Sequence, residues 1–143
     1  INLRQNYYNK KLIRENLDHS TVLKLNDTEL TEIAALFSIP DQEDQLLQTI
    51  LQKFNLNLIA LTKGAQGSKL ITQSESSYLQ PLDTQIRDTV GAGDSFTAAL
   101  VSGLLQNLTL RECLANANLL ASFVCSKDGA TPVIPNEILS KIS

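Results

Sequence analysis

The chain has 143 residues, of which 43% are hydrophobic and 19% charged, and its formal net charge is −3. This composition predicts one folded domain and excludes an intrinsically disordered chain. The basic residues are scattered, which argues against nucleic acid as a partner. Since there is no run of 18 apolar residues and no secretory leader, we expect a cytoplasmic protein that does not engage a membrane.

The first half of the chain predicts helices that alternate with short apolar strands. In two of the three predicted helices, apolar residues recur at helical spacing along one face. The second predicted strand is continuously apolar, as in a strand buried on both faces. From these patterns we expect helices at 9–16, 27–37 and 41–54, and strands at 21–25 and 56–62.

The second half predicts a short hairpin and then three helices. The hairpin strands are expected at 68–72 and 77–79, and the helices at 92–105, 110–125 and 136–142. Strands separated by helices favour βαβ units. The fold class predicted is therefore α/β, with a mainly parallel sheet flanked by helices on both faces. Such sheets bind ligands at the carboxyl ends of their strands.

The most informative segment is 88–96, which reads Asp-Thr-Val-Gly-Ala-Gly-Asp-Ser-Phe. Gly91 and Gly93 keep the backbone free of bulky side chains just before an apolar, alanine-rich helix. The first amides of a helix lack internal partners and carry partial positive charge, so this start can bind an anion. Asp94, in the first turn, can then accept a proton from an incoming hydroxyl. This combination indicates phosphoryl transfer.

Other interpretations of the same segment remain open or fail on spacing. An aspartate at a helix start can simply be a residue matched to the helix dipole. A dinucleotide fingerprint requires a third glycine at position 96, where the chain has Phe96. A Walker loop requires a glycine-lysine pair that neither this segment nor 64–69 provides.

The whole segment resembles the C-terminal signature of the ribokinase-like (PfkB) carbohydrate kinases, D-T-[TV]-G-A-G-D-x-F. Other segments match that family in the expected order. They resemble the end of its D-x-N-x-R segment, its N-x-x-E segment, its T-x-G-x-x-G-[SA] nucleotide turn and its last adenine and cation loops. These segments are 2–4, 24–30, 61–68, 117–118 and 127–130.

The resemblance implies a ribokinase-like, Rossmann-like fold that is truncated at its N-terminus. Members are usually much longer, and their N-terminal part carries most sugar contacts and a lid. Residues 1–143 therefore resemble the C-terminal, ATP-binding part alone. The implied activity is ATP-dependent phosphorylation of a sugar hydroxyl, with ATP and Mg²⁺ as cofactors and K⁺ as a further candidate.

The family likeness also implies roles for the glycine segment and the nucleotide turn. Asp94 is expected to act as general base, and the amides of Gly91, Ala92 and Gly93 to stabilise the transferring phosphoryl group. The nucleotide-binding candidates in the turn are Thr62, Gly64 and Gly67. The alternative for Thr62 and Gly64 is an ordinary turn that follows a strand.

Asn26 and Glu29 have two interpretations that can both hold. Their spacing, directly before an apolar helical run, is that of a capping box. The resemblance implies that Glu29 helps to place Mg²⁺ beside phosphate, usually through water, and that Asn26 orients the same region. Hard oxygen ligands with few direct protein contacts suit magnesium.

Two further sites follow from the resemblance. Asn118 is expected to border the adenine, although Asn116 is close enough in sequence for the register to differ. Asp88 and Val90, together with the backbone of 125–131, resemble the loops that hold a monovalent cation. Such a cation would balance phosphate charge and order the loop.

The acceptor is expected to be a fructose-type or ribose-type sugar, which Arg4 is placed to approach. The nearest alternative is that the acceptor is a nucleoside, as for a nucleoside kinase of the same family. A second class of function also stays open, namely a non-catalytic interaction or regulatory module that keeps the fold. A truncated sheet leaves an edge that can pair with another copy, so a homodimer is a candidate assembly.

Overall fold

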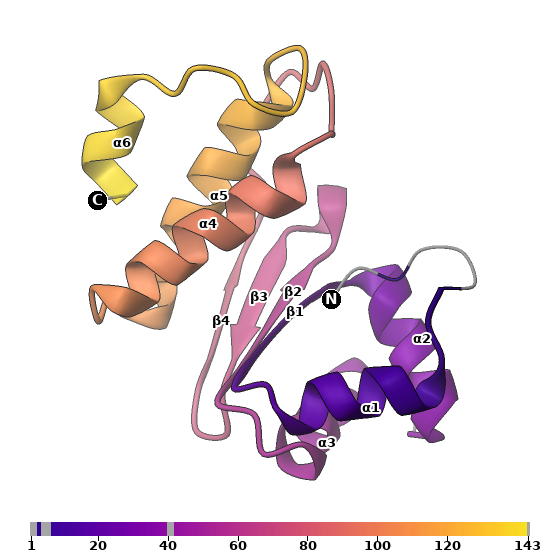
Figure 1. The fold of residues 1–143 in the computed structure, drawn as a ribbon. Coiled ribbons are helices and arrows are strands. Elements are labelled where there is room, and N and C mark those ends of the chain that lie inside the picture. Colours follow the sequence, from indigo (N-terminus) through magenta and orange to yellow (C-terminus); the bar gives the residue numbers. More distant parts are fainter. Residues whose placement is uncertain (1–2, 4–6, 40–41, 143) are drawn as a thin grey trace. The chain divides into compact units, whose positions relative to one another are not determined.

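The computed structural model describes residues 3, 7–39 and 42–142 (Figure 1). The predicted helices and strands form, and their ends differ from the prediction by two residues at most. Arg4, the predicted substrate contact, lies outside the described residues, and so does Pro40, which separates the helices predicted at 27–37 and 41–54. The elements are α1 (Lys10–Asp18), β1 (Val22–Asn26), α2 (Asp27–Phe37), α3 (Glu43–Lys53), β2 (Leu58–Thr62), the 3₁₀ turn η1 (Gly64–Gln66), β3 (Ser68–Ile71), β4 (Ser76–Leu79), α4 (Ala92–Leu105), α5 (Leu110–Cys125) and α6 (Asn136–Ile142).

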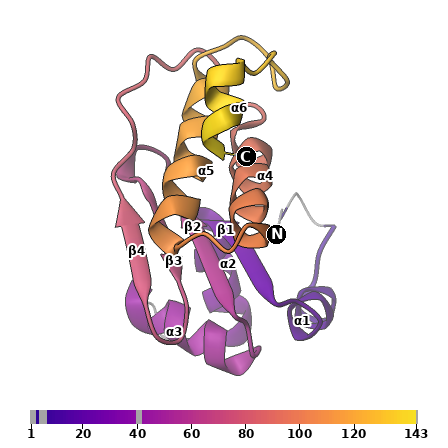
Figure 2. The same cartoon turned by 90° about the vertical axis from the view of Figure 1, so that its left-hand side faces the viewer.

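The sheet corrects one expectation. Within the described residues its strands lie in the order β1-β2-β3-β4, and β1 pairs with β2 in parallel (Figure 2). The prediction of a mainly parallel sheet was wrong, because the sheet is mixed. Only the short η1 turn joins β2 to β3, and only residues 72–75 join β3 to β4. Connections this short cannot carry the chain back to start a parallel neighbour.

The chain divides into two compact units. Residues 1–63 and 69–76 form the first unit, and residues 64–68 and 77–143 form the second. Each unit has buried hydrophobic side chains of its own. The nucleotide turn predicted from the sequence therefore belongs to the second unit from Gly64 onward, whereas β2 and its last residue Thr62 belong to the first.

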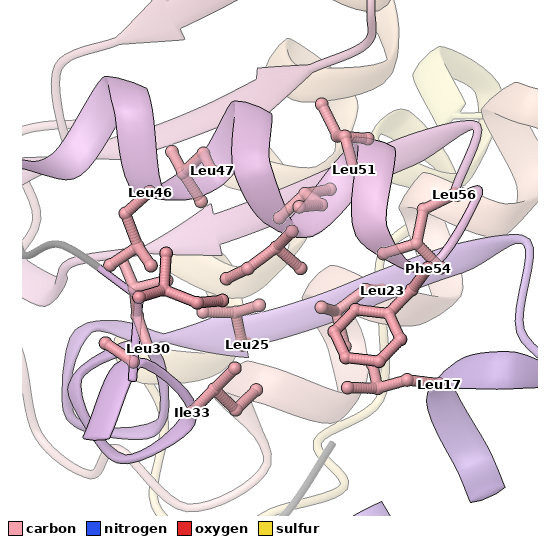
Figure 3. Packing of buried hydrophobic residues seen from close by; sticks show 14 of the residues in the cluster. Leu17, Leu23, Leu25, Leu30, Ile33, Leu46, Leu47, Leu51, Phe54 and Leu56 are labelled. Carbon is pink, nitrogen blue, oxygen red and sulfur yellow. The ribbon is translucent and has the colours of Figure 1, made fainter. Parts of the chain in front are cut away.

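The first unit is built on a leucine-rich core (Figure 3). The apolar stripes of α2 and α3 pack against β1 and β2, and Leu25, Leu47 and Leu61 have no exposed surface. Phe37 and Phe54 meet edge to face, with ring centroids 5.1 Å apart. Full burial of one such leucine contributes about 1.5–3 kcal/mol, so this core stabilises the two parallel strands.

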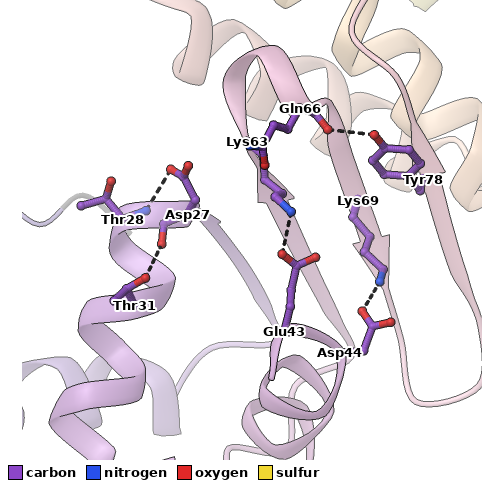
Figure 4. A network of polar contacts seen from close by, with 9 residues as sticks. All are labelled: Asp27, Thr28, Thr31, Glu43, Asp44, Lys63, Gln66, Lys69 and Tyr78. Atoms are coloured by element: carbon purple, nitrogen blue, oxygen red, sulfur yellow. Dashed lines mark hydrogen bonds and ion pairs between the residues drawn. The ribbon is translucent and has the colours of Figure 1, made fainter. Parts of the chain in front are cut away.

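Two ion pairs fix the start of α3 in the first unit (Figure 4). The Lys63 ammonium lies 2.6 Å from the Glu43 carboxylate, and Lys69 pairs with Asp44. Both acidic residues are in the first turn of α3, where negative charge also interacts favourably with the helix dipole. The pairs therefore hold α3 beside the ends of β2 and β3.

The second unit contains three helices that contact one another, α4, α5 and α6 (Figures 1 and 2). Gly103 of α4 lies against Cys113 of α5, and a Cβ added at Gly103 would stand 2.9 Å from the cysteine sulfur. Glycine thus permits close approach of these two helices. None of the described helices combines the length and apolar character that a bilayer crossing requires.

Candidate functional site

The start of α4 needs glycine for two separate reasons. Gly91 is the N-cap residue and has φ +83°, in the left-handed region that other residues rarely adopt. A Cβ at this position would also overlap the backbone of Ala130. The loop that follows α5 therefore passes so close to the start of α4 that only a glycine backbone fits between them.

No side-chain hydrogen bond caps α4 within the described part of the chain. The Ala92 N–H donates to the Thr89 carbonyl at 3.3 Å, within the preceding turn, and the first helical bond runs from Ser95 N–H to Gly91 C=O at 2.9 Å. The remaining first-turn amides have no acceptor one turn back, as at any helix start. Gly93 is exposed. The start of α4 is therefore open to an anion.

Asp94 lies in the first turn of α4 and is exposed. A carboxylate here interacts favourably with the positive end of the helix dipole. Its position on the helix, three residues after the glycine cap, keeps it beside the same turn of backbone. The site thus combines main-chain donors with an accessible proton acceptor.

The Asp88 carboxylate joins the two loops that flank the start of α4. One oxygen accepts the Val90 N–H at 2.9 Å, and the other accepts the Gly129 N–H at 3.2 Å. The Cys125 carbonyl accepts the N–H groups of Arg87 and Asp88. Burial, and next the Asp88 carboxylate, raise the pKa of the Cys125 thiol. The structure therefore brings together the loop residues that the sequence assigned to a monovalent cation.

The nucleotide turn predicted from the sequence is shaped by two glycines with positive φ. Gly64 has φ +52° and Gly67 has φ +86°. The Gly67 N–H donates to the Gly64 carbonyl at 3.1 Å, and a Cβ at Gly67 would overlap the Leu79 carbonyl. The Tyr78 hydroxyl donates to the Gln66 carbonyl at 2.8 Å (Figure 4). The hairpin strand β4 thus holds the turn in place.

Asn118 of α5 contacts the end of this same turn. The Ser68 hydroxyl donates to Asn118 Oδ1 at 2.7 Å, and Ser68 is only 2% exposed. Asn118 Nδ2 is buried and has no hydrogen-bond partner among the described residues. A buried donor without an acceptor is costly, and a bound ligand can supply the missing partner. The structure therefore joins Asn118 to the turn.

The first unit brings Asn26, Glu29 and Thr62 to one end of the parallel strands. Asn26 and Thr62 are register partners at the ends of β1 and β2. Asn26 Oδ1 accepts the Glu29 N–H and Glu29 Oε2 accepts the Asn26 N–H, both at 2.8 Å. The capping box suggested by the spacing is thus confirmed. Glu29 Oε1 also accepts the Leu3 N–H at 3.2 Å, which the sequence did not predict.

The Thr62 hydroxyl at the end of β2 points toward β1, where it donates a hydrogen bond to the Leu25 carbonyl at 3.4 Å. In the described ranges there is no cluster of three or more His, Cys, Asp or Glu side chains able to hold a metal ion. Sequence reasoning missed the contacts that Ser68, Tyr78 and Ala130 make with Asn118, Gln66 and Gly91. The serine that follows the G-x-x-G turn was the one available signal, and the other two contacts depend on tertiary packing.

The chain resembles known proteins over nearly its whole length. The model described as "pfkB family carbohydrate kinase" matches residues 2–137. The Arabidopsis thaliana protein named "Probable fructokinase-4" is 32% identical over 127 residues, which are 84% of this chain and 38% of that protein. The chain therefore spans about two fifths of the length of this relative.

Solved structures share the fold. The A. thaliana ribokinase complexed with ribose and ATP is 30% identical, with a TM-score of 0.75 over 92% of this chain and 43% of that one. An Escherichia coli structure with ATP and Mg²⁺ has a TM-score of 0.81 at 16% identity, over 93% of this chain and 42% of that one. The second match shows the fold alone.

Proposed function

Because the chain belongs to the pfkB family of carbohydrate kinases, we propose that it is the nucleotide-binding and catalytic-base part of an ATP-dependent sugar kinase. The observation that carries this proposal is the start of α4, where a glycine N-cap, an absence of side-chain capping within the described residues and an exposed Asp94 occur together. A module that only kept the fold would have no need for this combination.

The start of α4 stabilises negative charge. The main-chain N–H groups around Gly91, Ala92 and Gly93 lie at the positive end of the α4 dipole. Charge that develops on a transferring phosphoryl group is stabilised there by donors that need no rearrangement. The glycines exclude side chains from this place, so the phosphoryl oxygens can approach the backbone.

Asp94 removes the proton from the attacking hydroxyl of the sugar. Its carboxylate is exposed and lies one helical turn from the glycine cap. Loss of the proton makes the sugar oxygen a stronger nucleophile at the moment of transfer. The acceptor proposed is a fructose-type or ribose-type sugar, with Arg4 as a candidate contact to it.

Each unit contains residues whose chemistry suits ATP or Mg²⁺. When bound, ATP with Mg²⁺ supplies the phosphoryl group and neutralises part of its charge. The buried Nδ2 of Asn118 lacks an acceptor among the described residues, as a base-contacting donor would before the nucleotide binds. The turn with Gly64 and Gly67 would hold the nucleotide beside Asn118, and Thr62 is a further candidate contact.

Glu29 and Asn26 would orient the metal through water. Both Glu29 oxygens already accept backbone N–H groups, yet each oxygen keeps a lone pair for a metal-bound water. Asp88 and Val90, with the 125–131 backbone, would hold a monovalent cation such as K⁺. The Asp88 carboxylate already orders both loops at that place.

The proposal is tested by ATP consumption of the intact gene product against a panel of sugars, with nucleosides as the competing acceptors. We expect turnover with a furanose or keto-sugar and its loss in Asp94→Asn, while ATP binding is kept. Equal turnover in the two proteins would contradict the role of Asp94 as general base. No ATP-dependent product with any acceptor would favour a non-catalytic module.

A second test uses the 143-residue chain by itself. The relatives extend well beyond the part that this chain matches, so we expect it to bind nucleotide weakly and to phosphorylate no sugar. Robust sugar turnover by this chain would contradict the proposal that it is only the nucleotide-binding and catalytic-base part of the kinase. Analytical ultracentrifugation of the same sample would show whether it forms the homodimer that an open sheet edge allows.

A further inference from the structure

We propose that Ser68 is a positioning residue that fixes the orientation of the Asn118 amide, so that its NH₂ group is presented to a hydrogen-bond acceptor on the base of a bound nucleotide. This inference rests on the proposed function, because it takes the ligand to be ATP. It assigns a role to the Ser68 hydroxyl, whereas the shape of the nucleotide turn depends on Gly64 and Gly67.

The first step is the geometry of the pair. Ser68 is the first residue of β3, and Asn118 lies in the middle of α5. The Ser68 hydroxyl donates to Asn118 Oδ1 at 2.7 Å, a normal length for a hydroxyl donor. This bond occupies the carbonyl end of the amide. The amino end is thereby directed away from Ser68.

The second step is that the amino end lacks a partner. Asn118 Nδ2 has almost no solvent exposure, and none of the described residues accepts a hydrogen bond from it. In the described ranges it is the single buried side-chain nitrogen or oxygen that has no hydrogen-bond partner. Buried polar groups are nearly always paired, so an exception beside a glycine turn indicates a missing ligand atom.

The third step is the rigidity of the surroundings. Gly67, directly before Ser68, is held against the Leu79 backbone and bonded to Gly64. The Tyr78 hydroxyl holds the Gln66 carbonyl. Ala117 and Leu120 on either side of Asn118 are buried. With both segments packed in this way, donation from the Ser68 hydroxyl to Asn118 Oδ1 favours the orientation in which the NH₂ group faces away from Ser68.

The ligand class follows from the donor. Adenine offers ring nitrogens as acceptors, whereas a bare polyphosphate offers no base at all. The NH₂ group of Asn118 should therefore contribute to the affinity for ATP and not to the affinity for tripolyphosphate. A purely structural Ser68–Asn118 bond would change the stability of the fold without separating these two ligands.

The experiment measures binding of ATP·Mg²⁺ and of tripolyphosphate·Mg²⁺ to the ¹⁵N-labelled 143-residue chain, by NMR titration. The variants are Ser68→Ala, which removes only a hydroxyl, Asn118→Leu, which keeps the volume, and the double variant. We expect Asn118→Leu to weaken ATP about tenfold and Ser68→Ala about three- to tenfold. The double variant should stay within about twofold of Asn118→Leu, because orientation is irrelevant once the amide is gone.

Tripolyphosphate affinity should stay within about twofold in every variant. In the unaltered chain, ATP and not tripolyphosphate should shift the side-chain NH₂ signal of Asn118, a readout that does not depend on how a variant folds. The inference is overturned if Ser68→Ala leaves ATP affinity unchanged, if its effect adds to that of Asn118→Leu, or if ATP binds no more tightly than tripolyphosphate. Turnover of Asp94→Asn tests the proposed function separately, because that variant leaves Ser68 and Asn118 unchanged.

Discussion

The helices α2 and α4 begin in opposite ways. At α2, Asn26 and Glu29 close the helix start with reciprocal side-chain bonds, and the second Glu29 oxygen takes the Leu3 N–H. At α4 the cap is Gly91, which offers no side chain. The helix α5 repeats the closed arrangement with Thr109 and Glu112. Side chains that close a helix start stabilise the helix itself, whereas a start without side-chain caps leaves main-chain donors available to an anion.

The largest effect should come from the open start. Asp94→Asn keeps the size of the side chain and removes its ability to accept a proton at neutral pH. In the intact gene product we expect kcat to fall about 10²–10⁴-fold, as when a general base is lost. The KM for ATP should change little. Steady-state kinetics check this, and a change confined to KM would contradict the assigned role.

Next in size is Gly91→Ala. The substitution places a Cβ against the Ala130 backbone and forces a positive φ on alanine, so we expect a loss of about 2–3 kcal/mol in the free energy of unfolding. Urea denaturation of the 143-residue chain measures it.

Gly129→Ala is the matched control for that variant. It has the same φ of +83°, but nothing among the described residues lies within 4 Å of the added Cβ. We expect only the backbone strain, about 1 kcal/mol. Equal losses in the two variants would show that contact with Ala130 does not constrain the start of α4.

The closed start of α2 is probed by Glu29→Ala. The variant leaves the N–H groups of Asn26 and Leu3 without their acceptor, and we expect a loss of about 1–2 kcal/mol. If Glu29 also orients Mg²⁺, the Mg²⁺ concentration for half-maximal activity of the intact gene product should rise. An unchanged Mg²⁺ dependence would restrict Glu29 to capping.

The smallest effect concerns α5. The Thr109 hydroxyl, and then the Thr109 N–H, lower the pKa of Glu112 below its ordinary value of 4.5. Because the folded pKa is depressed, the contribution of Glu112 to stability is present above the unfolded pKa and is lost as pH falls through the folded value. An NMR pH titration should show the Glu112 pKa move up toward 4.5 in Thr109→Ala. An unmoved value would mean that the hydroxyl is not the main cause.

Local patterns predicted most of the elements and the start of α4 at the glycine segment. The helices α2, α4, α5 and α6 have the predicted bounds, because their apolar spacing and end residues act over a few neighbouring positions. The capping box of α2 and the glycine cap of α4 were both visible as short motifs. The predicted hairpin already implied antiparallel strands, and the predicted bounds left only a short connection between 62 and 68, so the expectation of a mainly parallel sheet did not use this signal.

The sequence by itself determined where helices and strands form, and it placed a glycine pair and an aspartate at the start of one helix, because these depend on local backbone preferences and side-chain spacing. Tertiary structure alone decided that the Ala130 backbone lies against Gly91 and that Ser68 donates a hydrogen bond to Asn118, fifty positions away in the sequence. Contacts between distant segments depend on how the elements pack, and no short stretch of residues encodes that packing.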